Sequence, residues 1–295
     1  MKFVNRNLQN IALALITMLI GLSAVQTFGQ GVVSKEFKEK AKAHKEFCGD
    51  GSYSYWSDER RSSVKELRES TLTAGGTINV DAKRNGGVSV IGEDRNDVLV
   101  RACINASAKT DAEAKALADS IRINTAGTIS PDGASDENGW AVSFELRVPR
   151  NSSVNLTANN GGIAVKNVEG NIEFSTKNGG VNLYGVAGSV KGKTVNGGII
   201  VSLTGNTWRG QGMDVQTTNG GVMLNVPADF AARVEAGTVN GGFNSNIVGL
   251  QPEKDTDDNG YYRPRPKKVS ADVNGGGPLV RVMTTNGGVK INTLE

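Results

Sequence analysis

The tripeptide Asn-Gly-Gly recurs along the chain, and most copies precede a short apolar-x-apolar step. Because side chains alternate along a strand, such a step is typical of a β-strand with one face turned inward. Asn and Gly accept a positive φ at low cost, so the triplet predicts a sharp corner before each strand. The copies that define the pattern begin at Asn85, Asn160, Asn178, Asn196, Asn219, Asn240 and Asn286.

The spacing of these triplets indicates a repeat. Successive Asn residues from Asn160 to Asn240 are separated by 18, 18, 23 and 21 residues. A corner that recurs at such a period predicts units that each bury an apolar face against the next. A Thr stands two residues before the Asn at Thr176, Thr194, Thr217, Thr238 and Thr284. We therefore expect an all-β fold, a β-solenoid (β-helix) of short stacked strands in which Asn stacks on Asn at one corner.

A series of β-hairpins is the alternative architecture. Asn-Gly between two alternating runs is a strong hairpin signal, and the runs on either side of Asn178-Gly179 fit it. Hairpins do not require the same turn chemistry at every second turn, however, and the repeated Thr-x-Asn-Gly-Gly at one phase favours stacking. Stacking and hairpins differ in one distance, because stacking places Asn178 and Asn196 one strand spacing apart, ~4.8 Å.

The first 30 residues have the pattern of a secretory signal peptide. Lys2 and Arg6 precede an apolar run from Ile11 to Val25. An N-terminal membrane anchor is the alternative, but the run is shorter than the ~20 residues that a spanning helix needs. We expect an exported mature chain without a transmembrane segment, located in the periplasm, in the cell envelope or outside the cell.

The rest of the chain divides by pattern. The expected regions are an irregular charged arm over residues 31–63, a cap region with strands and one helix over 64–150, and the repeat body over 151–295. Thr110 and Glu113 form a capping box that predicts a helix from Thr110 to Ser120. We expect this helix and its neighbouring strands to cap the N-terminal end of the solenoid, because an open end would expose strand edges and apolar core.

The composition argues against several classes of function. The chain has 38 Gly but only 5% aromatic residues, which suits a narrow solenoid better than a deep ligand pocket. Its formal charge of +3 gives no case for binding nucleic acid. The sequence contains no Ser/His/Asp set, no phosphate-binding loop and no dinucleotide fingerprint. We therefore expect no enzymatic activity and no cofactor.

Cys48 and Cys103 are the two cysteines of the chain. In an exported chain an even number of cysteines predicts a disulfide. Two free thiols remain an alternative, as does a catalytic pair of Cys48 with His44, the one histidine in the sequence.

Two further motifs each have a functional and a plain interpretation. Asp255, Asp257 and Asn259 match the first half of a calcium loop, but the twelfth position is Pro266 rather than Glu, which favours an acidic surface turn. Trp208 could offer an aromatic surface for ligand binding, or it could pack over the core at an insertion.

The repeated Thr-x-Asn-Gly-Gly-apolar-x-apolar pattern, the helix near residues 111–120 and the Val148-Pro149 step resemble the bacterial "putative-adhesin" β-solenoid domain family. The resemblance covers roughly residues 64–291. It implies a secreted or cell-envelope protein, and it transfers no catalytic residue.

These observations favour a non-catalytic secreted or cell-envelope protein that presents a flat surface for adhesion or assembly. Its partner would be a cell-surface glycan or protein. A carbohydrate-binding or carbohydrate-active β-helix is the alternative, although Glu169 and Glu173 do not recur at one phase as a catalytic carboxylate pair would. A sensing module is a third hypothesis, and it would need a further domain.

Overall fold

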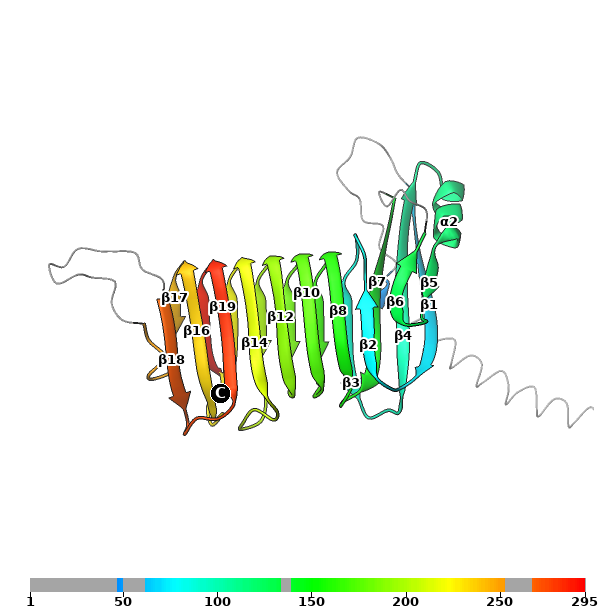
Figure 1. The fold of residues 1–295 in the computed structure, drawn as a ribbon. Helices are drawn as coiled ribbons and strands as arrows, with labels where there is room; N and C mark the ends of the chain where they lie inside the picture. Colours follow the sequence, from blue (N-terminus) through cyan, green and yellow to red (C-terminus); the bar gives the residue numbers. More distant parts are fainter. Residues whose placement is uncertain (1–46, 50–61, 134–138, 253–266, 295) are drawn as a thin grey trace, which may run out of the picture. The chain divides into compact units, whose positions relative to one another are not determined.

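A computed structural model of the protein describes residues 47–49, 62–133, 139–252 and 267–294. The chain divides into two compact units, residues 1–51 and 52–295. The second unit is predominantly β, and its strands form two large mixed sheets that do not close (Figure 1).

Each sheet has ten strands, and their order in space differs from their order along the chain. From one edge to the other, sheet A contains β1 (Ser62–Thr73), β4 (Asp97–Ala108), β7 (Trp140–Pro149), β3 (Val88–Glu93), β9 (Ile163–Lys166), β11 (Val181–Tyr184), β13 (Ile199–Ser202), β15 (Val222–Pro227), β20 (Val289–Leu294) and β17 (Phe243–Ser245). Sheet B contains β18 (Lys267–Val273), β16 (Ala232–Asn240), β19 (Leu279–Asn286), β14 (Gly212–Asn219), β12 (Ser189–Asn196), β10 (Asn171–Asn178), β8 (Ser153–Asn160), β2 (Thr77–Asp81), β6 (Thr128–Asp132) and β5 (Arg122–Asn124).

Each Asn-Gly-Gly triplet of the repeat body carries the chain from sheet B to sheet A. β10 ends at Asn178, and β11 begins at Val181 in the other sheet. The hairpin alternative is therefore wrong for this region, because a hairpin would pair β10 with β11. Both strands instead pair in parallel with the equivalent strands of the neighbouring turns.

Neighbouring turns are held in strict register. Asn178 is the partner of Asn196 in sheet B, and Val181 is the partner of Ile199 in sheet A. Since the register keeps equivalent positions together, the inward side chains form continuous apolar rows. One row of sheet A consists of Val88, Ile163, Val181, Ile199, Val222 and Val289, all buried.

The strand order departs from the chain order at the C-terminal end. β19 and β20 lie between the β14–β15 turn and the β16–β17 turn, although those two turns follow each other directly in the sequence. Figure 1 shows β19 in red between β14 and β16. Residues 279–294 therefore form a turn that lies between two other turns of the parallel body.

Antiparallel strands flank the parallel body. β1, β4 and β7 pair antiparallel at one end, and β18 pairs antiparallel with β16 at the other. The predicted helix is present as α2 (Asp111–Ser120), and Thr110 and Glu113 form its capping box. Its last turn has no basic residue, and Arg68 of β1 donates instead to the carbonyl oxygens of Ala118 and Ile121. The positive charge of Arg68 there interacts favourably with the negative end of the helix dipole.

Cys48 and Cys103 are joined in a disulfide, the pair that the sequence predicts. Cys103 belongs to β4, and both cysteines are buried. Bonds of this kind persist in oxidising compartments.

The first Gly of each triplet is required by a close backbone approach. A Cβ on Gly179 would lie 2.1 Å from the carbonyl oxygen of Gly161 in the preceding turn. The same distance is 1.9–2.2 Å for Gly161, Gly197, Gly220, Gly241 and Gly287.

The expectation of positive φ at these corners is wrong for most of them. None of the Asn residues that open the predicted triplets has a positive φ, and among the first glycines only Gly86 and Gly220 do. Steric exclusion by a neighbouring carbonyl group, rather than backbone handedness, explains why Gly recurs at this position along the chain.

The two glycines of one triplet give a matched test. Gly179→Ala should lower the free energy of unfolding by about 1–3 kcal/mol, because the added methyl group forces the turns apart. Gly180→Ala should be nearly neutral, since its Cβ would lie 3.5 Å from the nearest atom, the Gly198 carbonyl oxygen. Urea denaturation of both variants measures the difference. Equal destabilisation would contradict the steric explanation.

Candidate surface-binding face

The outward residues of six neighbouring strands form the surface that we name the sheet A face. The strands are β9, β11, β13, β15, β20 and β17, paired in parallel. Because the side chains alternate and the register is strict, the outward positions form two rows. The first row is Ala164, Asn182, Ile200, Met223, Lys290 and Asn244, and the second is Lys166, Tyr184, Ser202, Asn225 and Asn292.

The centre of the sheet A face exposes large apolar groups. Tyr184 is 46% exposed and Ile200 is 42% exposed, while Met223 on the next strand is half-buried. The ammonium group of Lys166 lies 5.5 Å from the centroid of the Tyr184 ring, within range of a cation–π interaction. The ammonium group lies over the face of the ring, and the Tyr184 side chain stays exposed.

Hydrogen bonds order the polar side chains of the second row. The Nδ2 of Asn225 donates to the Oγ of Ser202, at 3.0 Å. Asn292 repeats the contact one strand further, where its Nδ2 donates to the Oδ1 of Asn225, also at 3.0 Å. The amides are thus held in fixed orientations before any partner arrives.

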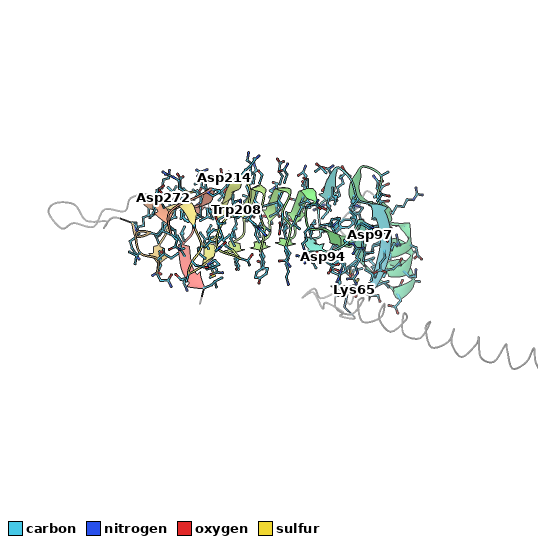
Figure 2. The ribbon with its side chains drawn as sticks, turned by 90° about the horizontal axis from the view of Figure 1, so that it is seen from below. Lys65, Asp94, Asp97, Trp208, Asp214 and Asp272 are labelled. Carbon is cyan, nitrogen blue, oxygen red and sulfur yellow. The ribbon has the colours of Figure 1, made fainter. Side chains whose placement is uncertain are left out.

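The sheet A face has no acidic residue, in contrast to the outer face of sheet B. There the register aligns alternating charges across five strands, in the order Glu173, Lys191, Asp214, Arg281 and Glu235. Figure 2 shows Asp214 on that face together with Asp272 of β18. Each charge in this row of sheet B thus has an opposite charge on a neighbouring strand, whereas the charged residues of the sheet A face are Lys166 and Lys290 alone.

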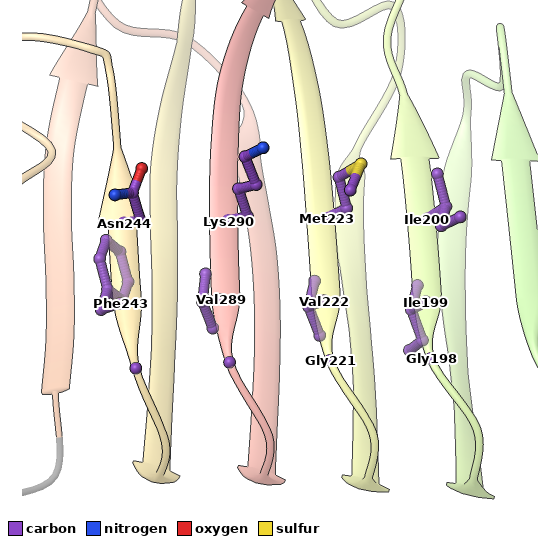
Figure 3. Close-up of a pocket in the computed structure, with 12 residues that line it drawn as sticks. Gly198, Ile199, Ile200, Gly221, Val222, Met223, Phe243, Asn244, Val289 and Lys290 are labelled. Carbon is purple, nitrogen blue, oxygen red and sulfur yellow. The ribbon is translucent and has the colours of Figure 1, made fainter.

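A shallow groove of about 580 Å³ lies on the C-terminal half of sheet A, where the strands leave the corner. Ile200, Met223, Lys290 and Asn244 line it side by side, one from each of four neighbouring strands (Figure 3). The second glycines of the triplets line it too, and they leave space because they have no side chain. The groove residues are Gly198, Ile199, Ile200, Gly221, Val222, Met223, Gly242, Phe243, Asn244, Gly288, Val289 and Lys290.

The predicted corner residues form an exposed ladder of amides beside this groove. The Nδ2 of each Asn donates to the Oδ1 of the Asn in the neighbouring turn, at 2.7–3.1 Å. In spatial order the ladder is Asn85, Asn160, Asn178, Asn196, Asn219, Asn286 and Asn240.

Buried threonines support the amide ladder from below. Thr194 is only 1% exposed, and its Oγ1 donates to the carbonyl oxygen of Gly179 at 2.8 Å. The same bond recurs at Thr176, Thr217, Thr238 and Thr284. A Thr two residues before the Asn thus satisfies the carbonyl group that excludes a Cβ from the next turn.

Trp208 does not offer a surface for binding. Its ring is 4% exposed, and its Nε1 donates to the carbonyl oxygen of Gly188 at 3.1 Å. The packing interpretation of this residue therefore holds, because the indole is buried and its polar atom is satisfied.

Other candidate residues fall outside the part that the structure describes. Asp255, Asp257 and Asn259 lie there, as does His44, and the calcium hypothesis stays untested. Within the described ranges, no group of three or more His, Cys, Asp or Glu side chains could hold a metal ion. No helix of the described residues is long and apolar enough to cross a membrane.

The sheet A face was not among the sites expected from the sequence, although the sequence holds a signal for it. The outward position between the two apolar residues after each triplet is polar at Asn182 but apolar at Ile200 and Met223. Apolar residues at positions that the alternation assigns to solvent indicate a binding surface.

The comparisons with known proteins identify distant structures only. No family model matches the chain, and no curated protein matches it in sequence. A "putative cell adhesion protein" from Clostridium sporogenes is similar with 11% identity and a TM-score of 0.37, over 78% of this chain and 100% of that one. A "putative adhesin" from Bacteroides fragilis has 9% identity and a TM-score of 0.31, over 78% and 97%.

A third solved structure is a "putative lipid binding protein" from Parabacteroides distasonis. It has 10% identity and a TM-score of 0.31, over 77% of this chain and 96% of that one. Likeness at this level identifies no family for the chain.

The amide ladder predicts a dependence on position. Asn196 takes part in two ladder bonds, to Asn178 and from Asn219, whereas the terminal Asn240 takes part in one, to Asn286. Asn196→Ala should therefore lower the free energy of unfolding by about 1–2 kcal/mol, and Asn240→Ala by about half as much. Thermal or urea unfolding of both variants checks this. A larger effect at Asn240 would show that the ladder does not couple the turns.

Proposed function

We propose that the protein is an exported, non-catalytic β-solenoid scaffold that binds a protein partner through the sheet A face, in adhesion or assembly at a cell surface. The observation that carries the proposal is the group of apolar side chains on three neighbouring strands, exposed at Tyr184 and Ile200 and half-buried at Met223, set among ordered amides. No other described part of sheets A and B combines these features in adjacent turns.

The composition of the sheet A face favours a protein as the partner. The cores of protein–protein interfaces are enriched in aromatic residues and Met and depleted in Asp and Glu. Tyr184 and Met223 supply the enriched types, and the face has no carboxylate. Its polar residues, Asn182, Asn244 and Asn292, surround the apolar centre as a rim does.

The scaffold suits binding to a large and flat partner. In a solenoid each turn adds one strand spacing, ~4.8 Å, so side chains of six strands contact a partner at once. The groove is shallow, and such a surface favours a macromolecule over a small substrate. The sheet A face has no pair of carboxylates that could serve as general acid and base.

Two features support export. The disulfide between Cys48 and Cys103 is of a type that persists in oxidising compartments. The pattern of residues 1–30 fits a secretory signal peptide that is removed from the mature chain.

A double variant of the exposed centre tests the proposal. Tyr184→Ser with Ile200→Ser should leave unfolding nearly unchanged, because both side chains lie on the outside. Binding of the mature chain to a panel of purified extracellular and envelope proteins, measured by surface plasmon resonance, should fall about tenfold or more, since exposed aromatic anchors dominate interface energetics.

A second double variant on the opposite face is the matched control. Glu173→Ser with Lys191→Ser alters two outward residues of sheet B and should leave binding unchanged. Equal loss of binding in both variants would contradict a role for the sheet A face. The chain could bind no protein of the panel but bind glycans on a glycan array. If the Tyr184→Ser/Ile200→Ser variant then abolishes that binding, the carbohydrate-binding alternative replaces the protein partner.

A further inference from the structure

The C-terminal turn, residues 279–294, occupies a slot between two turns that follow each other in the chain. β19 pairs in parallel with β14 on one side and with β16 on the other. β20 pairs in the same way with β15 and β17. Within sheets A and B, residues 279–294 are thus held by two strand edges in each sheet.

The slot recognises the C-terminal turn through specific side chains as well as through its backbone. Asn286 donates to Asn219 and accepts from Asn240, both at 2.8 Å. The guanidinium of Arg281 lies 3.0 Å from a carboxylate oxygen of Asp214 and 3.8 Å from one of Glu235. The slot therefore presents an amide pair and two carboxylates to an extended segment with Arg and Asn at these positions.

The β16–β17 turn borders the slot on its far side, and it is held by contacts that do not involve residues 279–294. The four residues between β15 and β16 cross the slot, and Ala231 donates its N–H to the carbonyl oxygen of Asn206 at 2.7 Å. The buried Phe230 fixes the same connection to the core. The β16–β17 turn also pairs with β18 through β16. The β16–β17 turn therefore keeps these contacts when residues 279–294 leave the slot.

A short hinge connects the C-terminal turn to the rest of the chain. It runs from Asn274 to Pro278, and four successive residues in it have a positive φ, from 48° at Asn274 to 153° at Gly277. Glycine adopts either sign of φ at low cost, so the three glycines of this hinge allow it to straighten. A short hinge that can straighten permits domain swapping, because every contact of the swapped segment is remade in the partner.

We propose that two copies of this chain exchange their C-terminal turns, so that residues 279–294 of each copy fill the slot of the other. The partner is a second copy because the slot matches this segment at Arg281, Thr284 and Asn286. Reciprocal exchange forms a closed dimer with two-fold symmetry. This inference does not depend on the proposed function of the sheet A face.

Cysteine pairs across the slot test the exchange in the full-length chain. Gln216 and Met283 are register partners in β14 and β19, so their Cα atoms lie about one strand spacing apart, ~4.8 Å, within the range for a disulfide. Substitution there leaves the Arg281–Asp214 pair intact. Gln216→Cys protein is mixed with Met283→Cys protein at high concentration, partly unfolded in urea, refolded and oxidised. We expect a covalent heterodimer in which mass spectrometry finds position 216 of one chain linked to position 283 of the other.

The control uses a neighbouring register pair that exchange leaves within one chain. Lys193 and Gln216 are partners in β12 and β14. A mixture of Lys193→Cys and Gln216→Cys proteins should therefore give no heterodimer. A link between chains in this control that matches the 216–283 yield would overturn the proposal, and so would the absence of a 216–283 link.

A second arm guards against variants that fail to fold. Oxidised at low concentration, where the chain is a monomer, the double variant Gln216→Cys/Met283→Cys should form its bond within one chain, which shows that both substitutions are tolerated. This bond holds residues 279–294 in their own slot, so the oxidised variant should yield no exchanged dimer when it is then concentrated, unfolded in urea and refolded. The unaltered chain, refolded at high concentration, should elute as a dimer that persists on dilution; a chain that is entirely monomeric after this treatment contradicts the exchange.

Discussion

The backbone contact between successive triplets is the constraint on which the rest of the structure depends. The first Gly of each corner faces the carbonyl group of the first Gly in the neighbouring turn, with no room for a Cβ. At this distance the Thr hydroxyl of one turn reaches the carbonyl group of the next, and the Asn amides come within hydrogen-bonding distance. Both ladders thus follow from one close approach, and together they fix the register of the parallel strands.

Because the register is fixed, the sequence of each strand determines which side chains form rows on the surface. Since equivalent positions coincide from turn to turn, an outward residue always joins a row rather than a scattered set. A row of alternating charge places opposite charges side by side on the outer face of sheet B, whereas rows of Asn with Tyr184 and Ile200 make the sheet A face amphiphilic. The inner rows adapt by volume, as where Phe174 fills the space beside Gly192 on the next strand.

The parts of this fold that local chemistry determines could be predicted from the sequence. The strands after each triplet follow from alternation, and α2 follows from the capping box of Thr110 and Glu113. The place of β19 and β20 could not be predicted, because the corners at Asn219, Asn240 and Asn286 carry the same Thr-x-Asn-Gly-Gly signature and a repeat does not say which turns are neighbours. The burial of Trp208 depends on how its insertion packs against the neighbouring turn, where the Gly188 carbonyl group accepts from its ring, and this becomes known only when the turns are stacked.

The charged side chains of sheet B distinguish between possible orders of the turns, which the repeated corners do not. If the β16–β17 turn packed directly on the β14–β15 turn in the same register, Glu235 would lie opposite Asp214, and like charges directly opposite destabilise a sheet. Insertion of β19 places Arg281 between these two carboxylates. The corner chemistry thus does not distinguish the order of these turns, and the outward row of sheet B favours the observed one. A cation at position 281 is then what makes the C-terminal turn the matching occupant of the slot, whether that turn comes from the same chain or from a second copy.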